Sequence, residues 1–316
     1  MTDLIKEALA LWNMPSATFS FVAERENRIY KVVHGTESFA LRIKRPGYRE
    51  KGELISELDW LRAMSCAGLG VSIPAPSKNG HFLELVGGMY VDMITWLNGT
   101  PLGQSRSPLT LDDPVRIFAY LGREMAKLHL ACDAWRPPCT FTRCNWNADG
   151  LVGESPLWGR FWENPTLEPD ARALLQEFRM RAAEHLSVLN LDTGLIHADL
   201  VRENVITDGQ TVFLIDFDDG GYGFRLFDVA TALFKNRAEP RYEELKSALI
   251  KGYSNVRFLD MSHLDLFLAL RAVTYVGWIV PRMNMPGSRA RNDYFAKDAL
   301  DLVRAYLEHS RPALEG

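Results

Sequence analysis

Residues 195–228, LIHADLVRENVITDGQTVFLIDFDDGGYGFRLFD, contain the pattern that decides the fold. Two short apolar runs flank the turn-forming pair Asp208-Gly209, and this arrangement predicts a β-hairpin. Asn204 stands directly before the first run and Asp216 directly after the second. Because the strands of a hairpin are antiparallel, both side chains are expected at the same open end of the pair. The segment therefore predicts a polar site at one end of a short hairpin.

The polar side chains of this segment suit a divalent metal and a base. One amide oxygen and one carboxylate, from Asn204 and Asp216, make a hard oxygen-donor site for Mg²⁺ that is held partly by phosphate oxygens. Asp199 lies in the preceding loop and can face the same space as a general base. We give His197 a supporting role, because a histidine here is more often a structural hydrogen-bonding group than a proton carrier. The alternative interpretation is a loop of turn-forming residues whose side chains bond only the backbone.

The motif H-x-D-x-x-x-x-N at residues 197–204 is followed by I-D-F-x-D at residues 215–219. This pair of motifs resembles the protein-kinase-like enzymes, and most of all the aminoglycoside phosphotransferase and choline kinase group. The resemblance covers nearly the whole chain and implies an ATP-dependent kinase. Three further segments are similar to the type II homoserine kinases and the bacterial stress response kinase: RIKRP at 42–46, LGREMAKLH at 121–129 and YVGWIVPRMN at 275–284.

The resemblance implies an α+β, two-lobed protein-kinase-like fold, and the residue pattern fits it. Residues 1–97 are expected to form an N-terminal nucleotide-binding lobe, a small antiparallel sheet with one helix near 50–67. Residues 98–316 are expected to form a larger, mostly helical lobe that carries the catalytic and acceptor-binding groups. Residues 134–165 are rich in Trp, Pro and Cys and receive no assignment. The helices expected in the second lobe lie near residues 113–132, 168–190, 225–236, 240–256, 262–280 and 293–310.

The strand around residue 40 is the expected contact with ATP. In the kinases that this chain resembles, a strand reading V-A-x-K places its lysine on the phosphates and its alanine against the adenine. Here residues 39–42 read F-A-L-R, so the resemblance implies that Ala40 lies against adenine and that Arg42 holds the phosphates. Lys44 lies on the same face of the strand, one pleat further on, and is the alternative phosphate ligand.

Two further nucleotide-site residues follow from the resemblance. The acidic partner of the strand cation is expected on the following helix, where Glu57 fits the family pattern better than Glu53. Residues 93–97, beginning at Met93, are the expected hinge, whose backbone would meet the edge of adenine. No G-x-G-x-x-G covers the phosphates, because the turn at residues 24–27 has no glycine. The small-molecule kinases that the chain resembles often lack those glycines as well.

The acceptor is expected between the proposed base, Asp199, and the helices after residue 225. The carboxylates of Asp218, Asp219 and Asp228 favour a cationic acceptor, such as an amino alcohol, an amino acid or an aminoglycoside. For Asp218 or Asp219, the alternative is a role in supporting the metal site.

Aromatic and basic residues near the C-terminus offer other acceptor contacts. Tyr275 and Trp278 are three positions apart on a predicted helix and could stack on a cation, although such pairs more often belong to a core. Arg271 and Arg282 could instead meet a carboxylate of the substrate. The residues therefore leave open whether the acceptor carries a carboxylate in addition to a positive charge.

Composition argues against several classes of partner. The 316 residues carry a formal net charge of -4, so there is no basic excess to neutralise a nucleic-acid backbone. The four cysteines form neither a disulfide framework nor a CxxC motif, which favours reduced thiols. The N-terminus lacks the basic region of a secretion signal, and the apolar stretch 272–280 is too short to cross a bilayer. We therefore expect a cytoplasmic protein without nucleic-acid or membrane partners.

Taken together, these features predict transfer of the ATP γ-phosphate, with Mg²⁺, to the hydroxyl of a small molecule such as an amino alcohol, a hydroxy amino acid or an aminoglycoside-like compound. One alternative is a Ser/Thr protein kinase like the stress response kinase, although residues 219–227 are short for an ordered peptide platform. Another alternative is a non-catalytic pseudokinase scaffold. The presence of Asp199, Asn204 and Asp216 argues against that alternative.

Overall fold

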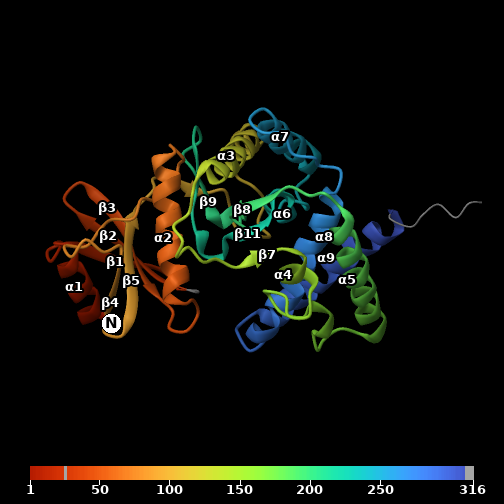
Figure 1. Ribbon diagram of the computed structural model, residues 1–316, viewed down its shortest axis with the longest axis horizontal. Coiled ribbons are helices and arrows are strands. Elements are labelled where there is room, and N and C mark those ends of the chain that lie inside the picture. Colours follow the sequence, from red (N-terminus) through yellow and green to blue (C-terminus); the bar gives the residue numbers. More distant parts are fainter. Residues whose placement is uncertain (25–26, 310–316) are drawn as a thin grey trace, which may run out of the picture.

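The computed structural model describes residues 1–24 and 27–309, and Figure 1 shows their arrangement. Part of the glycine-free turn at 24–27 and the predicted end of the last helix at residue 310 lie outside the described residues. An antiparallel sheet with two helices forms one end of the molecule, and helices form most of the other end (Figure 1). The α+β fold predicted from the sequence is therefore confirmed.

The N-terminal sheet is antiparallel throughout and has one helix on each side. Helix α1 (Thr2–Leu11) packs its apolar face on one side of the sheet, and α2 (Lys51–Cys66) lies on the other (Figure 1). The strands, in sheet order, are β1 (Thr18–Glu24), β2 (Asn27–His34), β3 (Glu37–Lys44), β5 (Met89–Thr95) and β4 (Leu83–Val86).

Strand β3 follows the period-two pattern that its sequence predicts. Phe39, Leu41 and Ile43 are buried in the cluster that α1 covers. Ala40 points the other way and packs with Leu58 of α2. Because successive side chains of a strand alternate between its faces, the two basic side chains of β3 also point toward α2. The pleat therefore delivers two cations to the side of the sheet that faces the rest of the molecule.

The hairpin predicted around Asp208-Gly209 is present. Strand β9 (Val205–Thr207) pairs with β10 (Val212–Leu214), and the carboxylate of Asp208 accepts hydrogen bonds from the backbone of the turn. Gly209 has φ +88°, a conformation that favours glycine. The backbone N–H of Ile215 donates to the carbonyl of Asn204 at 3.0 Å, so the two ends of the hairpin meet as the sequence predicts.

Short strands connect this hairpin to the rest of the molecule. Strand β6 (Thr100–Pro101) pairs with β9, so the chain joins the second sheet shortly after the predicted lobe boundary at residue 97. A third sheet has β11 (Gly221–Phe224) between β7 (Asn145–Trp146) and β8 (Thr193–Ile196). Strands β6, β7 and β11 were not predicted, because each is short and depends on a distant partner strand.

The helices of the second half lie close to their predicted positions. Asp113 caps α3 by accepting from the backbone N–H of Arg116 at 3.1 Å, with Pro114 in the first turn. The last helix begins at Ser288, five residues before the predicted start. The segment 134–165 contains β7, a short helix and a 3₁₀ turn. The helices are α3 (Pro114–Ala134), α4 (Ala148–Val152), α5 (Pro169–Val188), α6 (Arg225–Phe234), α7 (Tyr242–Ser254), α8 (Leu264–Trp278) and α9 (Ser288–His309).

One helical stretch, Leu264–Arg282, is long and apolar enough by length and composition to cross a membrane. It is longer than the stretch 272–280 that the sequence analysis considered. In the structure, 78% of its most apolar window is buried against the rest of the protein, as in the core helix of a globular fold.

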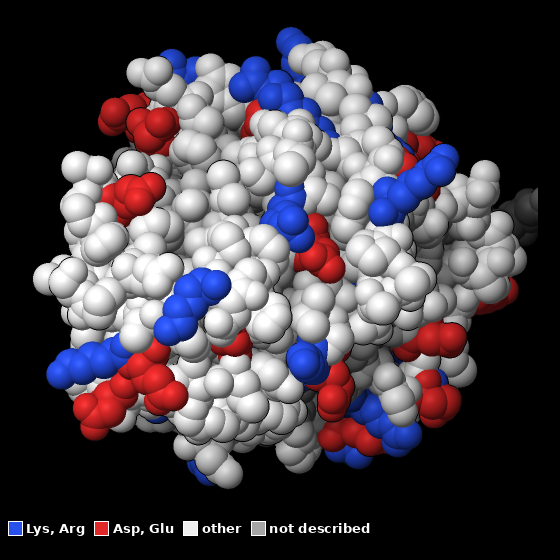
Figure 2. All heavy atoms as spheres, turned by 60° about the vertical axis from the view of Figure 1, so that its left-hand side comes forward, with Lys and Arg blue, Asp and Glu red and all other residues white. Residues whose placement is uncertain are grey.

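On the face shown in Figure 2, basic and acidic side chains are interspersed.

Candidate functional site

Asp199, the predicted base, is held from both sides in the loop that follows β8. Its Oδ1 accepts a hydrogen bond from Nη2 of Arg271 at 2.6 Å, and its Oδ2 accepts one from Nδ2 of Asn204 at 2.9 Å. The side chain of Asp199 is 21% exposed, whereas that of Arg271 is fully buried. The carboxylate is thus fixed in direction and remains open to solvent on one side, as a group that meets a substrate must be.

Asp228 lies beneath this loop and does not face an acceptor. Its Oδ1 accepts from the backbone N–H of Ala198 at 2.6 Å, and its Oδ2 accepts from that of His197 at 2.8 Å and contacts Nε2 of His129 at 3.1 Å. Burial alone would raise the pKa of Asp228, but the bonds from His129 and the loop backbone lower it. The sequence-based role of Asp228 in substrate binding is therefore wrong: this carboxylate holds the loop in place.

His197 also lies under the site. Its Nε2 lies 2.9 Å from the carbonyl oxygen of Ile215, and its ring packs on Phe217 with a centroid separation of 4.5 Å. The side chain is completely buried, and burial lowers its pKa, so the ring is neutral and fixed. It connects the loop 197–204 to the end of β10, which fits the supporting role we predicted.

Asn204 and Asp216 lie at the open end of the hairpin. Because Nδ2 of Asn204 is bonded to Asp199, its amide oxygen Oδ1 points away from that carboxylate. Asp216 has φ +65°, which turns its side chain out of the strand direction, and it keeps access to solvent. The surrounding protein, together with the charges of Asp218 and Asp199, raises the pKa of Asp216 to about 8.

This end of the hairpin suits a divalent cation. A cation there would neutralise the carboxylates whose mutual repulsion raises the pKa of Asp216. Across residues 1–24 and 27–309, no three His, Cys, Asp or Glu side chains gather closely enough to hold a metal by themselves. Asn204 and Asp216 therefore fit a cation that takes its remaining ligands from phosphate and water, which is usual for Mg²⁺.

Asp218 and Asp219 meet a cation that the sequence analysis overlooked. Arg49, in the segment between β3 and α2, donates from Nη2 to Oδ1 of Asp219 at 2.8 Å, and its Nε lies 3.9 Å from Oδ1 of Asp218. Arg143 bonds the backbone carbonyls of Phe217, Asp218 and Gly220 from beneath. Arg49 thus compensates part of the charge of these two carboxylates, which weakens the argument that they require a cationic acceptor.

The nucleotide side of the site contains four buried charged groups. Arg42 donates from Nε to Oδ1 of Asp92 at 2.7 Å and from Nη1 to Oε1 of Glu57 at 2.6 Å. Nζ of Lys44 lies 3.2 Å from Asp92 and 3.4 Å from Glu57. The two guanidinium-bonded carboxylates hold the pKa of Arg42 above its usual value, even though burial opposes this. Arg42 and Lys44 thus share the same pair of acidic partners.

Two of these residues bear on the sequence analysis. Glu57 takes the position predicted for it, while the carboxylate of Glu53 instead accepts from the backbone N–H of Glu50 at the start of α2. Asp92 was not predicted. It lies opposite Arg42 in the β3–β5 register and has no exposed surface. A lone aspartate within the apolar strand 89–95 was the available signal, because a buried carboxylate requires a partner.

Met93 does not have the position expected of a hinge residue. Its side chain is buried in the cluster under α1, on the face opposite Ala40. Its carbonyl accepts from the backbone N–H of Ala75 at 2.8 Å. Ala40 does lie on the α2 side of the sheet, as predicted. Of the predicted hinge, residues 93–97, only Trp96 and Leu97 lie beyond the end of β5 at Thr95.

The acceptor side is built from α8 and the segment 134–165. Tyr275 is buried between the rings of Phe234 and Phe295, at centroid separations of 5.6 Å and 4.9 Å, and its hydroxyl accepts from Arg271 at 2.7 Å. This ring belongs largely to the core, which was the alternative stated for it. The guanidinium of Arg271 also stacks over Trp158, with Cζ 4.6 Å from the ring centroid.

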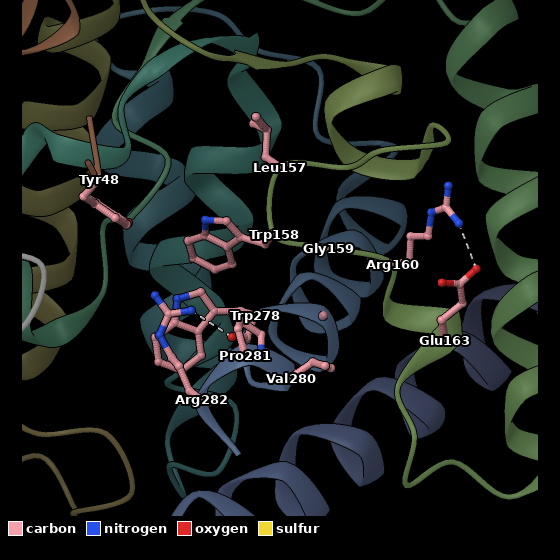
Figure 3. Close-up of a pocket in the computed structure, with 11 residues that line it drawn as sticks. Tyr48, Leu157, Trp158, Gly159, Arg160, Glu163, Trp278, Val280, Pro281 and Arg282 are labelled. Carbon is pink, nitrogen blue, oxygen red and sulfur yellow. Dashed lines mark hydrogen bonds and ion pairs between the residues drawn. The ribbon is translucent and has the colours of Figure 1, made fainter. Parts of the chain in front are cut away.

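A cavity of about 470 Å³ opens next to this cluster (Figure 3). Its walls include Tyr48, Trp158 and Trp278, and Arg282 lies over the ring of Trp278 at 4.0 Å. The guanidinium of Arg282, which also lines the cavity, thus covers one face of Trp278 (Figure 3). The cavity adjoins Trp158, whose ring contacts Arg271 and through it the carboxylate of Asp199.

Comparisons with known proteins agree with this arrangement. A family model described as the phosphotransferase enzyme family matches residues 18–262. The chain is 25% identical over 295 residues to amicoumacin kinase of Bacillus subtilis (strain 168), covering 87% of this chain and 83% of that protein. It is 28% identical over 257 residues to homoserine kinase of Neisseria meningitidis serogroup B, covering 78% and 77%. A solved microcompartment-associated aminopropanol kinase matches with a TM-score of 0.84 at 28% identity, covering 98% of both chains.

The family match covers well over half of the chain and includes every residue from β1 to the end of α7. It contains the loop 197–204, the hairpin and the buried charged groups of the N-terminal sheet. The predicted family resemblance is confirmed by these matches, which are to a phosphotransferase family and to kinases. The chain belongs to the phosphotransferase enzyme family and is a kinase.

Proposed function

We propose that this kinase transfers the γ-phosphate of ATP, with Mg²⁺, to the hydroxyl of a small molecule that also bears an amine. The observation that carries the proposal is the fixed carboxylate of Asp199. It lies between the amide of Asn204 on the metal side and the guanidinium of Arg271 on the acceptor side. A carboxylate in that place can orient a hydroxyl toward the phosphate and accept its proton.

The chain supplies positioning and charge for this reaction. Asp199 receives the proton of the acceptor hydroxyl as the hydroxyl oxygen bonds to the γ-phosphorus and the bond from that phosphorus to the bridging oxygen of ADP breaks. A Mg²⁺ ion, when bound, would neutralise charge on the phosphates between Asn204 and Asp216. His197 and Asp228 hold the loop 197–204 so that the carboxylate does not shift. Such preorganisation matters because phosphoryl transfer depends mainly on alignment and electrostatics.

For the nucleotide, we propose contacts on the α2 side of the sheet. Arg42 remains the proposed phosphate ligand, with Lys44 as the alternative, and Glu57 fixes both cations. Ala40 offers a small surface for the adenine ring. The backbone N–H of Trp96 already donates to the carbonyl of Ser38 at 2.9 Å, so the backbone contact with adenine is assigned to the carbonyl of Trp96 and the N–H of Leu97.

The amine in the proposed acceptor comes from the relatives. Their names include an amino acid substrate, homoserine, and an amino alcohol, aminopropanol. The chain that follows Asp216, the proposed metal ligand, argues against a protein substrate. Residues 221–224 form β11 between two other strands, and α6 follows at once, so the segment is a paired strand and not an extended peptide platform.

The proposal is tested by ATP consumption and by detection of the phosphorylated product across a panel of acceptors. The panel contains amino alcohols, hydroxy amino acids, aminoglycosides and a generic protein substrate. We expect acceptor-dependent, Mg²⁺-dependent turnover with a small hydroxyl compound and none with the protein. Turnover with the protein substrate alone would contradict the proposal and support the protein kinase alternative.

A further inference from the structure

Two cations share an aromatic surface on the acceptor side of the site. Lys235, directly after α6, places its amine 3.8 Å from the ring centroid of Tyr275 and 4.7 Å from that of Phe295. The guanidinium of Arg106 lies 4.3 Å from the ring centroid of Tyr294 and 5.9 Å from that of Phe295. Both cations therefore lie over Phe295, at the C-terminal side of the molecule.

A chain of contacts joins this aromatic surface to Asp199. The hydroxyl of Tyr275, whose ring lies under Lys235, accepts a hydrogen bond from Nη2 of Arg271 at 2.7 Å. The same Nη2 donates to Oδ1 of Asp199 at 2.6 Å. Because Arg271 is engaged with Asp199 and Tyr275, it is not the cation that remains available to a substrate. Lys235 lies one ring further from the reacting carboxylate and keeps part of its surface exposed.

The loop that carries Arg106 is fixed to the loop 197–204. The backbone N–H of Ser105 donates to Oε1 of Glu203 at 2.7 Å, and Nη1 of Arg202 donates to the carbonyl of Ser107 at 2.6 Å. These bonds hold the residues on either side of Arg106. The second cation is therefore positioned by the same loop that positions the proposed base.

Neither cation has an acidic partner within the described part of the chain. The carboxylates of Glu203 and Asp199 attract the amine of Lys235 from a distance. The guanidinium groups of Arg271 and Arg106 repel it. Burial and these neighbouring cations lower the pKa of Lys235 to about 7. Arg106 is exposed, whereas Lys235 is partly buried without a counter-ion, which is costly, and an anionic ligand would supply the missing charge.

We propose that Lys235, with Arg106 beside it, binds a carboxylate of the acceptor. This inference rests on the proposed function and narrows the acceptor to a hydroxy amino acid, in preference to an amino alcohol that lacks the carboxylate. The phosphorylated hydroxyl would lie at Asp199 and the carboxylate at Lys235, so the acceptor would span the distance between these two side chains. A purely structural contact between Lys235 and the aromatic rings is the competing explanation.

The test compares acceptors that differ only by the carboxylate. Homoserine is paired with 3-aminopropan-1-ol, and threonine with 1-aminopropan-2-ol. For each pair, kcat and KM are measured for the wild type, for Lys235→Met and Lys235→Arg, and for Lys251→Met, a control at an exposed lysine of α7. Thermal unfolding of each variant is measured alongside.

We expect the wild type to favour the carboxylate member of a pair. Lys235→Met should lower kcat/KM for that member by about 10- to 100-fold, mainly through KM, since a hydrogen bond to a charged group is worth about that much. The same variant should change kcat/KM for the amino alcohol by less than about twofold. Lys235→Arg should retain most of the preference, and Lys251→Met should behave as the wild type.

Two results would overturn the inference while leaving the proposed function in place. One is a wild type that favours the amino alcohols. The other is a Lys235→Met variant that lowers kcat/KM for both members of a pair equally, which is what a purely structural role predicts. Failure to phosphorylate any hydroxyl acceptor would instead overturn the proposed function, and this inference with it.

Discussion

Arg271 donates a 2.6 Å hydrogen bond from Nη2 to Oδ1 of Asp199 and thereby ties the proposed base to helix α8, 72 residues further along the chain. The guanidinium of Arg271 is itself fixed by its bond to the hydroxyl of Tyr275 and by stacking on Trp158. A group that is fixed in this way limits the directions that the carboxylate can take. The structure therefore makes the orientation of Asp199 depend on the acceptor side of the site.

Replacing Arg271 by lysine tests this dependence. Lysine keeps the positive charge but loses the planar fork and the stacking on Trp158. We expect kcat to fall by about tenfold or more, because small misplacements of a reacting group are costly, while ATP affinity stays within about twofold. Steady-state kinetics and calorimetry with a nucleotide analogue give the two values. An unchanged kcat would show that Asp199 does not need this contact.

Asp228 should behave as a structural residue and not as a substrate ligand. The two carboxylate oxygens of Asp228 now meet two backbone N–H groups and His129. Asp228→Asn leaves only one acceptor oxygen for these three groups. We expect the variant to lose about 1–3 kcal/mol of the free energy of unfolding and to lower kcat, with little change in the KM for the acceptor. Asp260→Asn, at an exposed position, is the matched control. A rise confined to the acceptor KM would restore the role predicted from the sequence.

The two cations of β3 should differ in how much the fold depends on them. Arg42→Met leaves the buried carboxylates of Asp92 and Glu57 with only Lys44. We expect this change to cost about 3–5 kcal/mol of stability, as breaking a buried pair does. Lys44→Met removes only the longer contacts of Lys44 with Asp92 and Glu57, so it should lower the free energy of unfolding by less. Chemical denaturation measures both, and a larger loss for Lys44→Met would contradict the arrangement described here.

The same two variants address the phosphate contact. Both Arg42→Lys and Lys44→Arg keep the positive charge, but only the first loses a guanidinium. If Arg42 holds the phosphates, Arg42→Lys should therefore weaken ATP binding more than Lys44→Arg does. Calorimetric titration with ATP and Mg²⁺ of the two folded variants decides between the cations. The opposite order of affinities would assign the phosphates to Lys44.

The preference for a carboxylate acceptor should depend on pH. The pKa of Lys235 is lowered to about 7, so the amine loses its charge as the pH rises through that value. We expect the ratio of kcat/KM for homoserine to that for 3-aminopropan-1-ol to fall between pH 6 and pH 8.5. The ratio should be flat for Lys235→Met. The groups that surround this amine are Arg271 and Tyr275 of α8, Asp199 and Glu203 of the loop 197–204, and Arg106 of the loop before α3.

If this kcat/KM ratio did not change with pH in the wild type, Lys235 would not be the group that binds the carboxylate. A ratio that falls equally in the wild type and in Lys235→Met would assign the titration to another of these groups. Using the ratio cancels effects of pH on Asp199 and on the nucleotide, because both acceptors share them.

The parts of the molecule that follow local rules were predictable. The hairpin after Asn204 was marked by apolar runs on both sides of Asp208-Gly209, and the backbone of that turn has the predicted form. The alternation in β3 placed Ala40 and Arg42 on the face toward α2. Such features depend on residues that are close in sequence, so spacing alone identifies them.

The errors and omissions arise from contacts between distant residues. Asp92 meets Arg42 only because β5 pairs with β3, and Arg49 meets Asp219 across 170 positions. Asp228 was taken for a substrate ligand because its distance from Asp219 in sequence is small. Its place at the start of the fully buried helix α6 was the signal that its partners would be internal.

The measurement that tests the central claim most directly is formation of the phosphorylated acceptor by the wild type and by Asp199→Asn. The amide keeps the size of the side chain but cannot accept the hydroxyl proton. We predict that the wild type phosphorylates the acceptor, and that kcat of Asp199→Asn is lower by about 10²- to 10⁴-fold with nearly unchanged ATP affinity. A loss of less than about tenfold in a folded, ATP-binding variant would contradict the account, because Asp199 would then not be the base.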